Sequence, residues 1–416
     1  MFLASSRPRR PGAVLPQGIW RFRGVPERGA EAGVASCARS VSSPATTRRG
    51  PQQVALPRVL VVSLAPAADA AQYAADLRNR TLELIEPRTN RNLALELLRV
   101  TEAGALAAAP LQGRGNKAAA DLRAVEAIRN AMAAVDMKGT VVIGEGEKDE
   151  APMLYFGEQL GNGLEPEVDV AVDPIEGTSL TASGLPGAIS VVALAERGSM
   201  FTTHVHYMQK LVVGRRARGV IDLEMPVAWN LRRIAKAEGL PAQELTVVVL
   251  ERERNQQIVS EIRDVGARIK LITAGDVAGA LEAALETRSG IHCMMGSGGA
   301  TEGVLAACAI KTIGGDMQAK LYFRDDKERA LAKTEGHDPN KVLHLDDLCS
   351  GSDIFFAATG ITSGELLKGV RYEDVYAYTQ SMVLRSASGT MRIVDAYHPI
   401  EKLRAKGLLP EQVAIP

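Results

Sequence analysis

The chain has 416 residues and an ordinary globular composition, with 46% hydrophobic and 24% charged side chains. Basic and acidic side chains balance at 49 each, so neither nucleic acid nor a membrane surface is indicated as a general partner. No apolar run approaches the roughly 20 residues that a membrane helix needs, and we expect no membrane-spanning helix. The four cysteines form no Cys-x-x-Cys pair, which predicts buried thiols of a reducing compartment rather than a disulfide frame.

Residues 1–75 differ in composition from the rest of the chain. They are rich in Arg, Ala, Ser, Pro and Gly, contain no Lys and carry few acids. Such a segment cannot bury a core, so we expect a basic, disordered extension. Three interpretations stay open: an organelle transit peptide, a disordered basic tail, or an upstream stretch of the reading frame that is not translated in the cell. None of them predicts catalytic chemistry in this segment.

Residues 76–235 are predicted to form a first lobe. Apolar residues recur at helical spacing in two segments that flank a glycine-rich turn at 111–117. A dense series of apolar strands follows and predicts one large sheet. The predicted helices are 91–109 and 119–136, and the predicted strands are 140–144, 168–172, 188–196 and 210–214.

Residues 236–416 are predicted to form a second lobe, with the boundary placed between 225 and 245. Strands and helices alternate here, which favours a mostly parallel sheet covered by helices. The polar stretch 324–343 is predicted to be a surface helix or loop. The predicted helices are 226–239, 255–265, 276–287 and 301–312, and the predicted strands are 245–251, 268–272, 291–295, 353–361 and 388–397.

The most informative motif is Asp173-Pro174-Ile175-Glu176-Gly177-Thr178, directly after the apolar run 168–172. Ligands of open α/β sheets bind at the carboxyl ends of strands. Two carboxylates three residues apart on a rigid turn can face one hard cation, and N–H groups at a helix start can bind an anion. The motif therefore predicts a metal-and-phosphate turn, although an acidic tight turn remains the alternative.

Three further acidic features lie near strand ends or glycine-rich turns, and each has a structural alternative. Asp121 could be an acid that favours a helix N-terminus. Glu145, in Gly-Glu-Gly-Glu after a predicted strand, could lie in a solvated turn. Glu302 could be a capping residue at the third helical position. His204 and His206 alternate on a predicted strand, but no further ligand joins them, so we interpret them as bystanders.

These motifs together resemble class II fructose-1,6-bisphosphatase, the bacterial type, within the metal-dependent, lithium-sensitive phosphatase superfamily. The resemblance runs from about Asn90 to near the C-terminus and is dense. It is strongest in TVVIGEGEKDEAPMLYFGEQLGNG (140–163), VDVAVDPIEGTSLTASG (168–184), GSGGATEGVLAA (296–307) and FAATGIT (356–362). It implies a layered α/β/α/β/α sugar-phosphatase sandwich of two lobes.

The resemblance also implies roles for individual residues. One divalent cation, Mn²⁺ or Mg²⁺, would bind Asp121 and Glu145, and a second would bind Asp173, Glu176 and Glu302. Thr178 would help position the attacking water, which makes Thr178, Asp173 and Glu176 the expected catalytic residues. The expected substrate-binding residues are Glu176, Gly177, Thr178, Tyr207, Arg252, Glu253, Arg254, Gly275, Asp276 and Gly299.

Four positions depart from the family pattern. Asn116 and Ala274 stand where the family often has an acid, and Ser297 and Thr301 replace a common isoleucine and proline. None of the four is among the expected metal ligands. The departures therefore bear on substrate preference more than on the reaction.

The resemblance implies hydrolysis of the C1 phosphate of fructose-1,6-bisphosphate in gluconeogenesis, and cyanobacterial relatives also act on sedoheptulose-1,7-bisphosphate. The alternatives are an inositol- or nucleotide-phosphate phosphatase of the same superfamily and a non-catalytic sugar-phosphate sensor. We expect a homodimer or homotetramer in the cytoplasm, or import into an organelle if residues 1–75 are a transit peptide.

Overall fold

The computed structural model describes residues 93–144 and 154–409. Every described residue belongs to one compact unit, 70–416. The predicted N-terminal extension and Glu145 lie outside the described residues. None of the described helices is long and apolar enough to cross a membrane.

The first sheet has eight strands in the order β12-β13-β11-β4-β3-β1-β2, with β14 paired to β13. Only the pair β1–β3 is parallel. The strands are β1 (Lys138–Ile143), β2 (Gln159–Leu160), β3 (Glu167–Glu176), β4 (Ile189–Glu196), β11 (Phe355–Gly360), β12 (Arg371–Glu373), β13 (Tyr376–Arg385) and β14 (Thr390–Pro399).

The second sheet has six strands in the order β10-β9-β5-β8-β6-β7. The predicted strand–helix alternation produces the parallel trio β7-β6-β8, whereas β5, β9 and β10 pair antiparallel. The prediction of a mostly parallel sheet is therefore right for only half of it. The strands are β5 (Tyr207–Val213), β6 (Thr246–Leu250), β7 (Arg268–Ile272), β8 (Cys293–Gly299), β9 (Asp316–Tyr322) and β10 (Leu343–His344).

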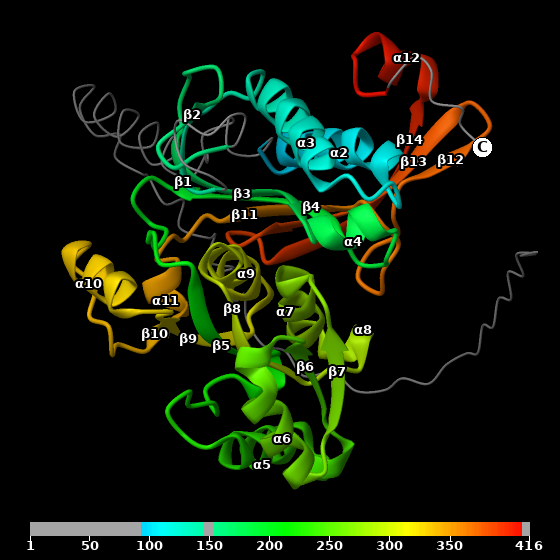
Figure 1. Cartoon of the computed structure of the whole chain (residues 1–416). Coiled ribbons are helices and arrows are strands. Elements are labelled where there is room, and N and C mark those ends of the chain that lie inside the picture. The colour runs from blue at the N-terminus through cyan, green and yellow to red at the C-terminus, as the bar shows by residue number, and fades with distance from the viewer. Residues whose placement is uncertain (1–92, 145–153, 410–416) are drawn as a thin grey trace, which may run out of the picture. The chain divides into compact units, whose positions relative to one another are not determined.

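Helices form three layers around the two sheets of this unit (Figure 1). Helices α2 (Leu93–Ala108) and α3 (Lys117–Met132) cover one face of the first sheet. Helices α7 (Asp276–Ala284) and α9 (Ala300–Ile313) lie in the middle layer, where α9 contacts both sheets. The outer face of the second sheet packs against α5 (Val227–Glu238) and α6 (Gln256–Val265). The expected α/β/α/β/α layering is confirmed.

The remaining helices are short or peripheral. They are α4 (Thr178–Ser183), α8 (Glu286–Ser289), α10 (Asp326–Thr334), α11 (Leu345–Leu348) and α12 (Ile400–Ala405). Helix α10 falls within the polar stretch that was predicted to be a surface helix or loop. The sheets do not divide the chain at residue 235, because β5 precedes that point and lies in the second sheet. The last strands, β11 to β14, return to the first.

The middle layer brings the chain's acidic motifs toward one another. Strand β3 ends at Glu176, and α7 and α9 begin at Asp276 and Ala300. Helix α9 packs against β3 and β4, so its first turn approaches the end of β3. Apolar residues of α7 and α9 share one buried cluster with the inner face of the first sheet, including Val191, Val304 and Phe356. Other apolar residues of the same two helices share a second cluster with the inner face of the second sheet. This packing holds the backbone at the strand ends in place.

A buried carboxylate between α2 and the first sheet leads to the first testable prediction. Glu102 is 7% exposed and accepts a hydrogen bond from the Thr379 hydroxyl at 3.4 Å, and His398 lies 3.8 Å away. Burial raises the pKa of Glu102 to about 7, against an unfolded value of 4.5. The folded chain therefore keeps a proton that the unfolded chain loses, and stability falls as the pH rises from about 4.5 to 7.

Replacing Glu102 by glutamine is expected to remove this part of the pH dependence. Above pH 7 the variant should be more stable than the parent by up to about 3 kcal/mol, because the amide never ionises. Urea unfolding at pH 5 and pH 8 measures the difference. The control is Glu96→Gln on the same helix, whose carboxylate pairs with Arg99 at the surface. Equal pH slopes for the parent and the Glu102 variant would contradict the prediction.

Candidate active site at the end of β3

The turn at the end of β3 places two carboxylates inside the protein. Asp173 and Glu176 are 4% and 2% exposed. Pro174 between them has no N–H to donate, and the register with β4 shifts between the two acids. Gly177 follows with a φ of 94°, which a residue with a Cβ adopts only under strain, and α4 begins at Thr178. The predicted turn is present, with both acids buried.

Glu176 lies close to two more carboxylates, those of Asp276 and Glu302, in the first turns of α7 and α9. The N–H of Val277 donates to Glu176 Oε1 over 3.2 Å. Burial, followed by the charges of Asp276 and Glu302, raises the pKa of Glu176 to about 8. We call Glu176, Asp276 and Glu302 the carboxylate cluster. The repulsion among its members has to be offset by a cation or by protonation.

Lys210 of β5 supplies one positive charge to the carboxylate cluster. It is 2% exposed, forms an ion pair with Asp276 Oδ2 and donates to the carbonyl of Gly299 over 2.8 Å. The ammonium also lowers the pKa of Glu302, although burial outweighs this effect and the net shift is upward. Lys210 and, more weakly, the Arg254 guanidinium offset part of the charge of Asp276 and Glu302, so the three carboxylates keep an excess of negative charge, which favours binding of a further cation.

Replacing Gly299 by alanine is expected to displace the Glu302 carboxylate. A Cβ at this position would come within 1.8 Å of Glu302 Oε2. Gly299 has an ordinary φ of −65°, so alanine introduces no backbone strain and the chain should stay folded. We expect kcat/KM to fall about 10- to 100-fold, as for a small misplacement of a reacting group, with little change in Tm. Steady-state kinetics and a thermal melt check this. An unchanged kcat/KM would show that the position of the Glu302 carboxylate does not matter for the reaction.

Asp121 and Thr178 meet between α3 and α4. Thr178 Oγ1 lies 3.1 Å from the carbonyl oxygen of Ile175 and is also within hydrogen-bonding reach of the Asp121 carboxylate. Burial raises the pKa of Asp121, and the Thr178 hydroxyl and Lys117 partly oppose the rise. Lys117 also donates to Ser179 Oγ over 2.7 Å. These contacts place Asp121 beside Thr178, and its role as a metal ligand stays a prediction.

Tyr207, at the start of β5, lies between two guanidinium groups. Arg254 is 4.3 Å from the ring centroid and donates from Nε to the carbonyl of Ser297 over 3.0 Å. Arg324 is 5.9 Å from the same ring. Two cations beside one aromatic ring at the end of a strand are suited to an anionic group such as a phosphate.

The other expected substrate residues are divided between two places. Gly275 precedes α7 with a φ of 96°, and a Cβ there would lie 3.9 Å from Glu176 Oε2, so Gly275 adjoins the carboxylate cluster. Arg252 and Glu253 are exposed and line a separate hollow of about 440 Å³ that extends to Arg263. The structure thus places Arg254, but not Arg252, against Tyr207.

The donor set can be tested for its fit to a hard cation. Asp121 Oδ1, Glu176 Oε2 and Asp276 Oδ1 are buried and lack a hydrogen-bond partner among the described residues. Unpaired carboxylate oxygens in the interior suit Mg²⁺ or Mn²⁺. Within 93–144 and 154–409, no three or more His, Cys, Asp or Glu side chains are gathered closely enough to ligate a metal directly. Glu145, the expected partner of Asp121, lies outside those ranges, so the metal ligands stay a prediction.

The histidines next to the site have partners of their own. His204 Nδ1 lies 2.6 Å from Glu335 Oε1, and His206 Nδ1 lies 2.9 Å from Glu328 Oε1. Both imidazoles are exposed. Their contacts hold the segment before β5 against α10, in agreement with the interpretation of these histidines as bystanders.

Comparison with known proteins identifies the family. The family described as "Bacterial fructose-1,6-bisphosphatase, glpX-encoded" matches residues 91–398. The chain is 43% identical over 327 residues to the class 2 fructose-1,6-bisphosphatase of Haemophilus influenzae, covering 76% of this chain and 98% of that protein. It is 41% identical over 325 residues to fructose-1,6-bisphosphatase 1 class 2 of Escherichia coli K12, covering 75% and 96%. The chain belongs to the class 2 fructose-1,6-bisphosphatases.

Class 2 membership confirms the resemblance seen in the motifs. The matched residues include β3, the carboxylate cluster and Tyr207, and they exclude residues 1–90. The structure adds two basic residues, Lys117 and Arg324, that the sequence analysis did not connect with the site. Lys117 lies four residues before Asp121, a helical spacing that could have indicated the contact. Arg324 begins a polar stretch with no local signal, and only packing brings it to Tyr207.

Proposed function

We propose that this chain hydrolyses the C1 phosphate of fructose-1,6-bisphosphate, yielding fructose-6-phosphate and phosphate, as a step of gluconeogenesis. Membership of the class 2 fructose-1,6-bisphosphatases supports the substrate. The observation that supports the chemistry is the carboxylate cluster at the end of β3, where three acids lie together and the buried Lys210 pairs with one of them. Divalent cations would neutralise this excess of negative charge, and the same cations can bind a phosphate ester.

The chain's own groups have distinct tasks in this proposal. Asp121, Asp173, Glu176 and Glu302, with Glu145, would hold Mn²⁺ or Mg²⁺. When bound, these cations would neutralise the phosphate and make a water molecule more acidic. Thr178 can donate its one hydroxyl proton to either Asp121 or the carbonyl of Ile175. Because a hydroxyl oxygen also has two lone pairs, Thr178 can accept a hydrogen bond from a water at the same time.

The remote end of the substrate would bind at Tyr207. Arg254 provides one permanent positive charge there that a second phosphate can neutralise, and Arg324, whose charge Glu328 already pairs with, adds a second guanidinium beside the ring. Binding of this phosphate orients the C1 end, because remote contacts lower the entropy cost of reaching the reactive geometry. A monophosphate substrate gains nothing from these charges. The proposal therefore favours a bisphosphate over an inositol or nucleotide monophosphate.

Several finer points belong to the same proposal. We place the chain in the lithium-sensitive metal-dependent superfamily because of its Asp-Pro-Ile-Glu-Gly-Thr turn. We expect sedoheptulose-1,7-bisphosphate as a second substrate, since it offers the same two phosphates. A homodimer or homotetramer in the cytoplasm is the expected state.

A phosphate-release panel tests the proposed function. The full chain is assayed with fructose-1,6-bisphosphate, sedoheptulose-1,7-bisphosphate, inositol monophosphate and a nucleotide monophosphate, in Mn²⁺, Mg²⁺ or EDTA. We expect one equivalent of phosphate from fructose-1,6-bisphosphate, none in EDTA and little from the monophosphates. Arg254→Ala should raise KM for the bisphosphate at least about tenfold, as expected for loss of a charge-assisted contact. Faster turnover of a monophosphate, or binding without turnover, would overturn the proposal.

A further inference from the structure

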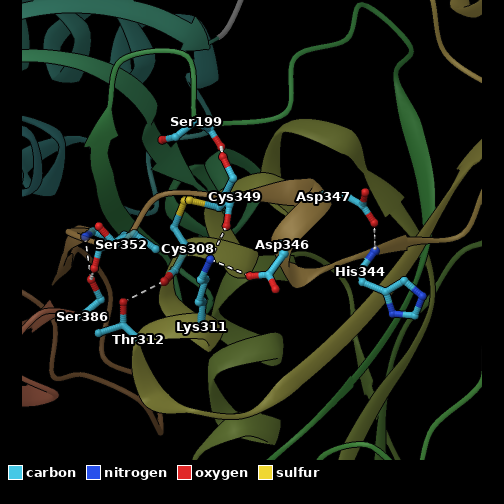
Figure 2. A network of polar contacts seen from close by, with 12 residues as sticks. Ser199, Cys308, Lys311, Thr312, His344, Asp346, Asp347, Cys349, Ser352 and Ser386 are labelled. Carbon is cyan, nitrogen blue, oxygen red and sulfur yellow. Dashed lines mark hydrogen bonds and ion pairs between the residues drawn. The ribbon is translucent and has the colours of Figure 1, made fainter.

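Two buried cysteines lie in contact at the centre of the middle layer. Cys308 belongs to α9, and Cys349 directly follows α11. Both side chains are fully buried in the cluster that packs α7 and α9 against the inner face of the first sheet. Their thiols are within hydrogen-bonding reach of each other, and Figure 2 shows the two side chains close together among the polar contacts that surround Cys349. Both cysteines are free thiols.

The backbone around Cys349 is held from several sides. Its N–H donates to the carbonyl of Leu345 over 2.8 Å, and its carbonyl accepts from Lys311 Nζ over 2.8 Å. A β-bridge pairs Cys349 with Met200. Lys311 lies on α9, one turn after Cys308, and also pairs with Asp346 of α11 over 2.7 Å (Figure 2). Lys311 therefore joins helix α9 to the segment that carries Cys349, and these contacts hold the two cysteines beside each other.

The surroundings of the pair favour one sulfur as the nucleophile. The thiol of Cys308 and the N–H of Gly351 donate toward the Cys349 sulfur, and the Lys311 ammonium is near, so the pKa of Cys349 is lowered. The pKa of Cys308 is raised by the same contact and by burial. This differs from Cys293 of β8, which lies in a different apolar cluster and whose pKa burial raises.

We propose that Cys308 and Cys349 are a modification site, a dithiol that hydrogen peroxide converts to a reversible disulfide. Cys349 thiolate attacks the peroxide, forms a sulfenic acid and releases hydroxide. Cys308 then attacks the sulfenic sulfur, the S–O bond breaks, and water forms with the thiol proton. In sum, two thiols and one peroxide give one disulfide and two waters, and the sulfurs lose the two electrons that the peroxide gains.

The burial of both sulfurs restricts the oxidant. Neither cysteine has exposed surface, so a bulky disulfide reagent cannot reach them without opening the middle layer, whereas a molecule the size of peroxide can enter with a small fluctuation. The bond would link residues 41 positions apart and tie α9 to the segment that leads into β11. Because Cys308 lies six residues after Glu302 on α9, about 9 Å along the axis, we expect the main effect on stability rather than on catalysis.

Mass spectrometry of the intact, unsubstituted chain tests the site. After treatment with stoichiometric peroxide and alkylation of free thiols, peptide mapping should recover the Cys308 and Cys349 peptides as one cross-linked species. Two alkylation sites should be lost and then restored by dithiothreitol. The oxidised chain should melt several degrees higher than the reduced chain. Cys349→Ser and Cys308→Ser should each abolish both changes, whereas Cys293→Ser, the matched control, should keep them.

Because the mapping is done on the unsubstituted chain, a variant that fails to fold does not affect the result. A cross-link that involves Cys37 or Cys293 instead, or oxidation of Cys349 to sulfinic acid with Cys308 still alkylated, would overturn the proposal. So would full alkylation of both cysteines after peroxide treatment.

Discussion

Replacing Asp173 by asparagine should lower turnover of fructose-1,6-bisphosphate at least about 100-fold while the chain stays folded. Asp173 lies three residues before the end of β3 and is 4% exposed, and its Oδ1 accepts from the N–H of Ile175 over 3.1 Å. An asparagine oxygen can accept the same hydrogen bond, so the turn should keep its shape. What the variant loses is a negative charge, and with it the affinity for a divalent cation.

Asp169 offers a matched control on the same strand. It is fully buried, pairs with Arg197 and accepts from the N–H groups of Ser199 and Met200 over 2.8 and 3.1 Å. Asp169→Asn should cost about 1–3 kcal/mol of stability, because it removes the charge that strengthens the hydrogen bonds Asp169 accepts inside the protein, yet the folded fraction should keep its kcat. Urea unfolding and steady-state kinetics on both variants separate the two roles. Near-normal turnover by the Asp173 variant would show that this carboxylate does not bind the catalytic metal.

Replacing Lys210 by methionine is expected to give the largest loss of stability among single substitutions in the site. Methionine matches the apolar stem but leaves Asp276 and Glu302 without the ammonium. Breaking a buried ion pair from one side typically costs about 3–5 kcal/mol, since the remaining charge is buried and unpaired. Turnover should also fall, because the carbonyl of Gly299 loses the donor that positions it at 2.8 Å.

Unfolding in EDTA measures this effect without a divalent cation that could replace the ammonium. Adding Asp276→Asn to the Lys210 variant should recover part of the loss, because it removes the uncompensated charge. The control is Lys320→Met, whose ammonium pairs over 3.1 Å with Glu224, a carboxylate that is 61% exposed. That variant should lose only about 1 kcal/mol. Equal losses for the two lysine variants would mean that Lys210 contributes no more than a surface ion pair.

The sequence by itself determined the family, most of the helices and strands, and the central turn. Apolar periodicity is a local property, and it placed α2, α5, β3 and β4 within a few residues of where they lie. It missed β13, because Thr379 and Ser381 interrupt the apolar pattern in the middle of that strand. Those two hydroxyls are buried and bonded to groups on α2 and β11, contacts that a local pattern cannot show.

The tertiary structure alone decided which side chains share the site. Asp276 was expected to contact substrate, and the packing of α7 against the end of β3 adds it to Glu176 and Glu302. The place of Lys210 depends on β5, which crosses into the second sheet between β8 and β9. Such pairings join residues tens of positions apart. Their free energy comes from burial and charge compensation in the assembled core, which no short stretch of the chain contains.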